Sequence, residues 1–242
     1  SLIPNSDVFI WLMMAALLAG AIWLNIATAV GAPVSTTHAI VGGVLGAGIA
    51  AGGFGIANWD QMKLIAASWV ISPVIGGIIA AAFLYWIKHG ITYRKDMISA
   101  AQRILPILVS IMVLAFSTYL IMKGLKKVIK VDILPAAGIG LFLAVITYFI
   151  VKSLTRKHSS AMKNEKKSIN RLFTLPLIFA AALLSFAHGA NDVANAVGPL
   201  AAIADTITNH GVASKAPIPF WVMGVGASGI VLGLALFGPK LI

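Results

Sequence analysis

Long apolar runs are the feature that most limits what this chain can fold into. A helix that crosses a bilayer needs about 20 mostly apolar residues. Five runs reach or approach this length, and two others, 33–54 and 172–203, are apolar but irregular, because glycines, a proline or polar residues interrupt them. The runs predict an all-α, polytopic membrane protein, which we expect in the inner or plasma membrane. The stretches that reach or approach the spanning length are 8–30, 64–87, 104–122, 134–151 and 218–237.

Composition agrees with a membrane location. Charged residues make up 10% of the chain and hydrophobic residues 60%, whereas soluble domains carry about 25% charged residues. The formal net charge of +11 does not indicate nucleic-acid binding, because the basic residues occupy short linkers between apolar runs, as the positive-inside rule predicts. The absence of cysteine excludes a disulfide framework and a thiolate metal site.

The basic linkers also predict orientation and organisation. Segments 88–103 and 152–171 together hold eleven of the 18 Lys and Arg residues, and segment 123–130 holds four. The majority places 88–103 and 152–171 in the cytoplasm. Because 152–171 is the most polar stretch, it is interpreted as a linker between two membrane modules, 1–151 and 172–242.

One carboxylate lies within an apolar run. In 172–203 only His188 and Asp192 are ionisable. The Asp192 carboxylate and the carboxamides of Asn191 and Asn195 are costly at membrane depth unless an ion or a polar ligand pairs with them. Helical spacing of three and four residues lets these three side chains converge on one face, and such oxygen donors suit a hard cation. We therefore expect Na⁺ or a proton at Asp192, and interpret His188 as a structural hydrogen-bonding residue.

Glycine and proline around this acid predict a break in the helix. Gly189 comes just before the polar residues, and Gly198 and Pro199 come just after them. The run of 32 residues is also too long for one simple span at about 1.5 Å rise per residue. We therefore expect a discontinuous helix whose backbone N–H groups at Gly189 and Ala190 face a solute, since a helix N-terminus favours an anion. Broken helices of this kind are typical of transporters.

A second polar cluster opens the glycine-rich run. Ser35, Thr36, Thr37 and His38 follow Pro33, a pattern that predicts the start of a helix. Three hydroxyls and the free N–H groups of a first helical turn would form a neutral cup for a tetrahedral oxyanion. The hydroxyls could instead bond to local backbone carbonyls. His38 could donate to the anion, titrate, or fix the threonine geometry.

The apolar runs contain no interior lysine or arginine. An anion bound there would need co-transported cations, helix dipoles and hydroxyl groups to balance its charge. This favours symport with Na⁺ or protons over a passive anion channel, because anion channels commonly use rings of Lys or Arg. A channel and a non-transporting receptor or scaffold are the alternatives from other functional classes. Asn25 receives only a supporting role.

Two segments resemble the signatures of the inorganic phosphate transporter (PiT) family. They are 31–42, Gly-Ala-Pro-Val-Ser-Thr-Thr-His-Ala-Ile-Val-Gly, and 186–200, Phe-Ala-His-Gly-Ala-Asn-Asp-Val-Ala-Asn-Ala-Val-Gly-Pro-Leu. Both occur in the family's order, with the basic linker between them. The resemblance implies an inverted-repeat transporter fold with discontinuous or re-entrant helices. This chain has one copy of each motif, so it is expected to be a central portion: 1–151 is the late part of the first repeat and 172–242 the early part of the second.

The resemblance also implies a function and a set of roles. It implies import of inorganic phosphate by symport with Na⁺ or H⁺ across the lipid bilayer, without enzymatic chemistry and without a cofactor. Sulfate or a metal–phosphate complex is the alternative substrate, and a homo-oligomer is left open. The residues expected to bind substrate are Ser35, Thr36, Thr37, Gly189, Ala190, Asn191 and Asp192; those expected to bind the coupling cation are Asn191, Asp192 and Asn195, with support from His38, His188 and Asn25.

Overall fold

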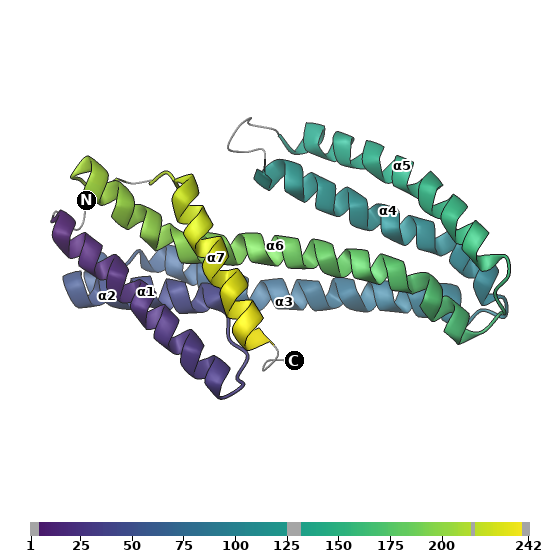
Figure 1. Cartoon of the computed structure of the whole chain (residues 1–242), viewed down its shortest axis with the longest axis horizontal. Helices are drawn as coiled ribbons and strands as arrows, with labels where there is room; N and C mark the ends of the chain where they lie inside the picture. The colour runs from purple at the N-terminus through teal and green to yellow at the C-terminus, as the bar shows by residue number, and fades with distance from the viewer. Residues whose placement is uncertain (1–4, 125–131, 214–215, 239–242) are drawn as a thin grey trace. The chain divides into compact units, whose positions relative to one another are not determined.

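The computed structural model describes residues 5–124, 132–213 and 216–238, and in these ranges it is helical and contains no strand (Figure 1). Of the lysine cluster expected at 123–130, only Lys123 lies within the described residues. The elements are α1 (Ser6–Ala29), α2 (Thr36–Gly52), η1 (Phe54–Ile56), α3 (Trp59–Ile87), η2 (Lys88–Thr92), α4 (Met97–Gly124), α5 (Ile133–Ser159), α6 (Lys166–Asn209) and α7 (Phe220–Phe237).

The described residues contain six helical stretches that are long and apolar enough to cross a membrane, so the chain is a multi-pass membrane protein. These are α1, α3 with η2, α4, α5, α6 and α7. The predicted runs 64–87, 104–122 and 134–151 lie within them, whereas 8–30 extends one residue beyond α1 and 218–237 begins two residues before α7. Helix α2 is shorter, with 17 residues. Large apolar side chains such as Trp11 and Leu134 are exposed along these helices, because lipid tails are as apolar as the side chains that they meet.

Contacts divide the chain into two compact units, which are described separately. One unit consists of Ser1–Ser68 with Phe186–Ile242, and the other is Trp69–Ser185. The boundaries between them fall inside α3 and α6. The modules 1–151 and 172–242 rest on the polarity of 152–171 and on the repeat order implied by the family resemblance. These are different criteria from contacts, and the modules stay a prediction.

The segment 152–171 is largely helical and not an irregular loop, while its role as a linker between two modules stays a prediction. Helix α5 continues to Ser159 and α6 begins at Lys166, which leaves a connection of six residues. A count of apolar residues misses this because helices continue beyond the hydrocarbon region with polar side chains. The polar stretch is therefore mainly the two ends of a helical hairpin.

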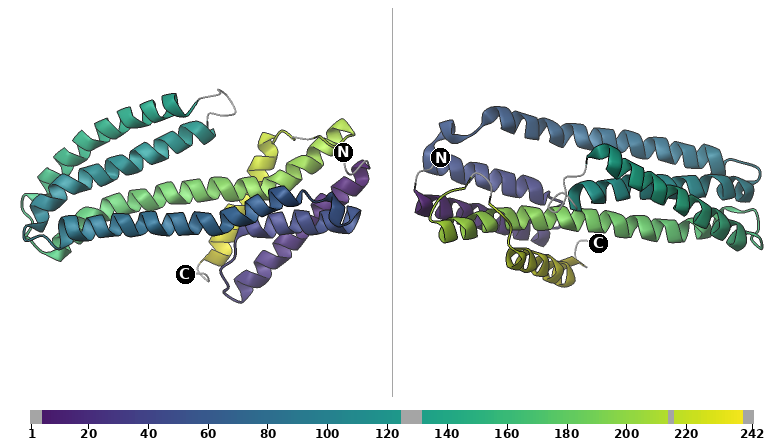
Figure 2. Two further views of the ribbon diagram at one scale, coloured as in Figure 1. Left: turned by 180° about the vertical axis from the view of Figure 1, so that it is seen from behind. Right: turned by 90° about the horizontal axis from the view of Figure 1, so that it is seen from above.

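In the unit Trp69–Ser185, hydrogen bonds place the basic segments 88–103 and 152–171 at the same end. The Asn164 side chain accepts from the Met97 backbone N–H at 2.8 Å and donates to the Lys95 carbonyl at 2.6 Å. This agrees with the charge argument that put both segments on one side of the membrane. Figures 1 and 2 show α4 and α5 side by side. The buried core of this unit is Ile91, Ala101, Leu105, Val109, Ile169 and Leu172.

In the other unit, α1 and α2 approach closely at a glycine. A Cβ atom added to Gly43 would lie 2.8 Å from the Ala16 carbonyl oxygen, closer than real Cβ contacts allow. The neighbouring Gly42 faces open space. Gly43 therefore permits the α1–α2 contact, as small residues do in membrane helix pairs. A smaller core forms where α6 meets α7, at Val197, Ala201 and Val222.

We expect Gly43→Ala to lower the thermal unfolding midpoint of the purified protein, because the added methyl group must push the two backbones apart. Overpacking of this kind costs about 1–3 kcal/mol. Gly42→Ala is the matched control: it makes the same chemical change one residue away without the clash, and should leave the midpoint unchanged or raise it. Intrinsic fluorescence during heating in detergent measures both. Equal midpoints for the two variants would contradict the close approach.

Candidate functional site

The serine–threonine motif begins α2, as the sequence predicts. Ser35 has extended backbone angles (φ −91°, ψ 123°) and is the N-cap, and its Oγ accepts from the His38 backbone N–H at 3.3 Å. Thr36 is the first helical residue. The N–H groups of a first helical turn have no intrahelical acceptor, so the start of α2 presents backbone donors beside the threonine hydroxyls.

Helix α6 is continuous through the second motif, so the predicted break near Gly189 is wrong. One helix runs from Lys166 to Asn209, 44 residues. The N–H groups of Gly189 and Ala190 lie in its interior, where helix geometry pairs each with the carbonyl four residues earlier. Their expected role as amide donors therefore has no basis in this geometry. Glycine in a helix costs only about 1 kcal/mol, and membrane helices also accommodate proline.

Two hydrogen bonds join α2 to α6. Thr36 Oγ1 donates to Asp192 Oδ1 at 2.7 Å, and Asn195 Nδ2 donates to Thr37 Oγ1 at 2.7 Å. The partners are 156 and 158 residues apart in the sequence. Adjacent hydroxyls on α2 thus contact two α6 residues separated by about one helical turn. The structure therefore brings together the two motifs that the sequence analysis singled out.

Asp192 has protein neighbours at both carboxylate oxygens. Oδ1 accepts from Thr36, and Oδ2 lies 3.3 Å from His188 Nε2 on the same helix. The Asp192 side chain is 19% exposed, whereas that of His188 is 75% exposed. A ligand that approaches this acid can therefore displace the exposed His188 imidazole more readily than the part-buried Thr36 hydroxyl.

The described residues contain no group of three or more His, Asp or Glu side chains that could hold a metal ion. A cation at Asp192 would accordingly be held by one carboxylate with hydroxyl, carboxamide or carbonyl oxygens. Na⁺ and protons accept such neutral oxygen partners, in keeping with the preference of hard cations for oxygen.

Two candidate residues lie outside this cluster. Asn191 is exposed, and its side chain makes no hydrogen bond within the described part of the chain. At about 100° per residue, Asn191 lies about 40° around α6 from Asn195 and about 100° from Asp192, so its position on the helix does not separate it from Asn195. Asn25 Nδ2 donates to the Ala21 carbonyl of its own helix at 2.8 Å. Roles for Asn191 and Asn25 stay predictions, as does the role of the His38 ring.

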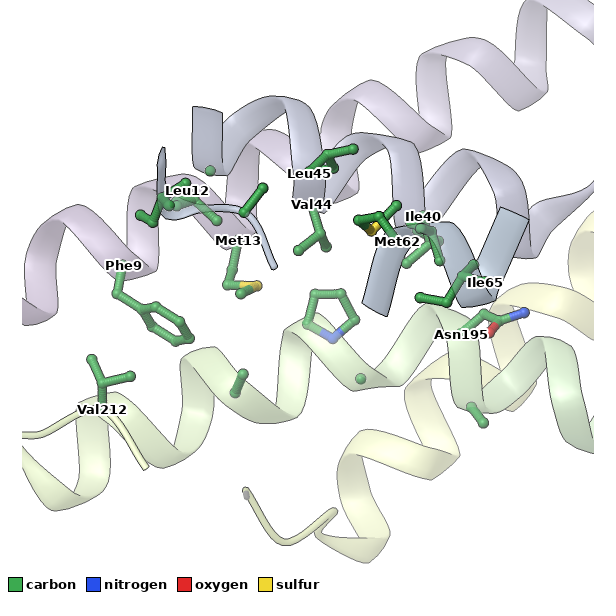
Figure 3. A pocket seen from close by; sticks show the side chains of 18 of the residues that line it. Phe9, Leu12, Met13, Ile40, Val44, Leu45, Met62, Ile65, Asn195 and Val212 are labelled. Atoms are coloured by element: carbon green, nitrogen blue, oxygen red, sulfur yellow. The ribbon is translucent and has the colours of Figure 1, made fainter. Parts of the chain in front are cut away.

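An apolar cavity of about 830 Å³ adjoins the cluster in the same unit. Figure 3 shows Phe9, Met13 and Val44 pointing into it, with Asn195 at its edge. Asn195 is the polar side chain among the described lining residues. Burying a charge in such surroundings is costly, so the cavity does not suit a free anion. Sequence reasoning did not identify it, although Ile40, Val44 and Gly48 repeat at a spacing of four residues along α2, the signal of one helix face.

Comparison with known proteins assigns the family. The family model described as "Phosphate transporter family" matches residues 1–242. The chain belongs to this family. Among solved structures, "The sodium-dependent phosphate transporter" is similar with a TM-score of 0.90 and 32% sequence identity, over 98% of this chain and 58% of that chain. This likeness confirms the expected transporter fold.

Curated relatives in the phosphate transporter family are similar over almost the whole chain. "Putative phosphate permease" of Helicobacter pylori (strain J99) is 51% identical over 99% of this chain and 46% of its own length. A relative of the same description from Pyrococcus furiosus is 35% identical over 100% of this chain and 58% of its own length. The chain therefore spans about half the length of the curated relatives it matches.

Proposed function

We propose that this protein imports inorganic phosphate by symport with a cation, as a transporter and not an enzyme. The observation that carries the proposal is the pair of hydrogen bonds by which Thr36 and Thr37 of α2 contact Asp192 and Asn195 of α6. These bonds bring the hydroxyls suited to an oxyanion next to the acid suited to a cation. Family membership and the relatives' description as phosphate permeases support the substrate.

The α2 start is the proposed phosphate contact. Ser35, Thr36 and Thr37 offer hydroxyls, and the first-turn N–H groups of α2 offer backbone donors at the positive end of the helix dipole. Because α6 is continuous, it supplies no backbone amides here, and α2 alone provides them. The anion is therefore proposed to bind side-chain hydroxyls and one helix N-terminus.

Asp192 is the proposed cation ligand, with Asn195 beside it. In the state described, Thr36 and His188 occupy the positions near its oxygens. Cation binding would replace the exposed His188 contact and leave the Thr36 hydroxyl between cation and anion. Such an arrangement couples the two solutes, since each partly neutralises the other in a region of low dielectric. The name of the similar solved structure favours Na⁺ over H⁺.

The test is uptake of radiolabelled phosphate by vesicles that contain the protein in its native length. Uptake is expected to saturate with phosphate and to fall at least tenfold when the Na⁺ gradient is collapsed by an ionophore. If uptake depends on the proton gradient alone, the coupling cation is H⁺ and not Na⁺. Uptake that does not saturate and ignores both gradients would contradict symport and indicate a channel. Excess unlabelled sulfate is expected to inhibit phosphate uptake poorly. Inhibition by sulfate as strong as that by unlabelled phosphate would contradict the assignment of phosphate as the specific substrate.

A further inference from the structure

A second cavity, of about 760 Å³, lies in the unit Trp69–Ser185, apart from the site described above. It is formed by η2, the connection 93–96 and the first turns of α4. Three basic side chains line it, those of Arg94, Lys95 and Arg103, together with the Ser99 hydroxyl. We call it the basic cavity. The proposed transport function uses none of these residues.

The one acid among the described lining residues is already engaged. Asp96 Oδ1 accepts from the Ser99 backbone N–H at 3.0 Å and so caps the start of α4. Hydrogen bonds from the Ser99 side chain and backbone, with a smaller contribution from the Arg103 charge, hold the pKa of Asp96 below its usual range. Asp96 therefore offsets one of the three positive charges, and the basic cavity keeps an excess of cations.

An aromatic ladder indicates the depth of the basic cavity in the bilayer. The rings of Tyr85 and His89 stack with centroids 3.9 Å apart, and His89 meets Tyr93 edge-on at 5.2 Å. Tyr85 and Tyr93 are exposed, and Tyr93 also lines the cavity. Exposed aromatic rings of membrane proteins gather at the level of the lipid headgroups. The cavity also lies where one candidate span ends at Thr92 and the next begins at Met97.

A turn of π-helix and a glycine give the basic cavity its shape. In η2 the Tyr93 N–H donates to the Lys88 carbonyl, five residues earlier, at 2.8 Å. A Cβ atom on Gly90 would lie 2.6 Å from Ile104 Cδ1, so glycine lets η2 pack closely on α4. Arg94 of the connection and Arg103 of α4 line the same cavity beside this contact. Single π-turns inside helices occur frequently at functional sites.

We propose that the basic cavity binds the phosphodiester headgroup of an anionic phospholipid. Arginine forms paired hydrogen bonds with phosphate oxygens, and Ser99 can bond a headgroup hydroxyl. Directly along α4, Ile104 lines the cavity and Ile107 is exposed one turn deeper, which gives acyl chains an apolar surface that a free phosphate does not need. The charge pattern places this end of the unit in the cytoplasmic leaflet, where basic pockets between membrane helices bind anionic headgroups.

The test titrates the purified protein, in a neutral detergent, with phosphatidylglycerol and counts bound lipids by native mass spectrometry. The variant is Arg94→Gln with Lys95→Gln, because both residues lie outside the helices and leave the Asp96 cap intact. Each cation near a headgroup is expected to contribute about fivefold in affinity, so the double variant should bind roughly 25-fold more weakly. Phosphatidylcholine, which carries no net charge, should bind poorly to both proteins.

The matched control is Lys166→Gln with Lys167→Gln. These two exposed lysines lie at the same end of the unit, at the start of α6, but do not line the basic cavity. The control variant should lose less than twofold in affinity for phosphatidylglycerol. An equal loss of affinity in both double variants would overturn the proposal, because it would indicate nonspecific electrostatic attraction to any basic residue at this end of the unit. Displacement of the lipid by an equal concentration of inorganic phosphate would overturn the lipid assignment. If the first variant aggregates, Arg103→Gln, which removes the cation on α4, replaces it in the same measurement and should also bind phosphatidylglycerol more weakly.

Discussion

Replacing Asp192 by asparagine is expected to reduce phosphate uptake about a hundredfold, because a charged interaction worth roughly 3 kcal/mol is lost. Asparagine keeps nearly the same shape, and its carbonyl oxygen can still accept from Thr36. The negative charge that attracts the coupling cation disappears. Asp192→Asn therefore separates the role of Asp192 as a cation ligand from its role as a hydrogen-bond partner. Initial rates of radiolabelled phosphate uptake at a Na⁺ concentration below saturation for the native protein measure the effect.

Asp60→Asn is the control for Asp192→Asn. Asp60 makes an exposed ion pair with Lys63 at 3.1 Å, and its side chain is 92% exposed. Exposed pairs contribute little, so uptake should stay within twofold of the native rate. Both variants should match the native protein in the amount found in the membrane and in elution volume on size-exclusion chromatography. Native uptake by a well-folded Asp192→Asn protein would remove Asp192 from the cation site.

Replacing Thr36 by valine is expected to lower uptake efficiency about thirtyfold, since a hydrogen bond to a charged group contributes roughly 2 kcal/mol. Valine keeps the β-branched shape but has no hydroxyl for Asp192 or for phosphate. Ser35 remains as the N-cap of α2, so the helix should still begin at the same residue. Thr36→Ser restores the hydroxyl and should recover uptake to within about threefold of the native rate.

Thr147→Val is the control for the threonine change. Thr147 Oγ1 donates to the Leu143 carbonyl of its own helix at 2.8 Å, so its loss should leave uptake unchanged. Because Thr36 contacts Asp192 directly, the effects of Thr36→Val and Asp192→Asn should not add in the double variant. Additive effects, or equal effects of the valine changes at 36 and 147, would show that the contact has no part in transport.

The helices could be predicted from the sequence better than their ends could. Apolar runs located each spanning helix, but α4 begins at Met97 and not near Ile104. Asp96 and Ser99 provide an N-terminal cap there, and polar side chains such as Gln102 then lie on the helix. Hydropathy reports burial in lipid, whereas a helix ends where its backbone hydrogen bonds find caps. The same reason explains why most of 152–171 is helical.

The candidate site could be predicted in its residue types but not in its pairing. The serine cap was readable because hydroxyl residues before an apolar run satisfy first-turn N–H groups. The break at Gly189 was wrong because glycine and proline weaken a membrane helix without interrupting it: Pro73 lies inside α3 and Pro106 inside α4. That Thr36 meets Asp192, or Thr37 meets Asn195, follows from tertiary packing, which one sequence does not report.

The two short bonds between α2 and α6 are mechanically linked. Thr36 and Thr37 are neighbours on one helix, and Asp192 and Asn195 are about one turn apart on another. Neither hydrogen bond can therefore lengthen without the other when the helices move as rigid bodies. A rotation or slide of either helix would release the acid and the carboxamide in the same movement. The cation and the anion would then bind and leave together when α2 and α6 separate, because one movement opens both contacts.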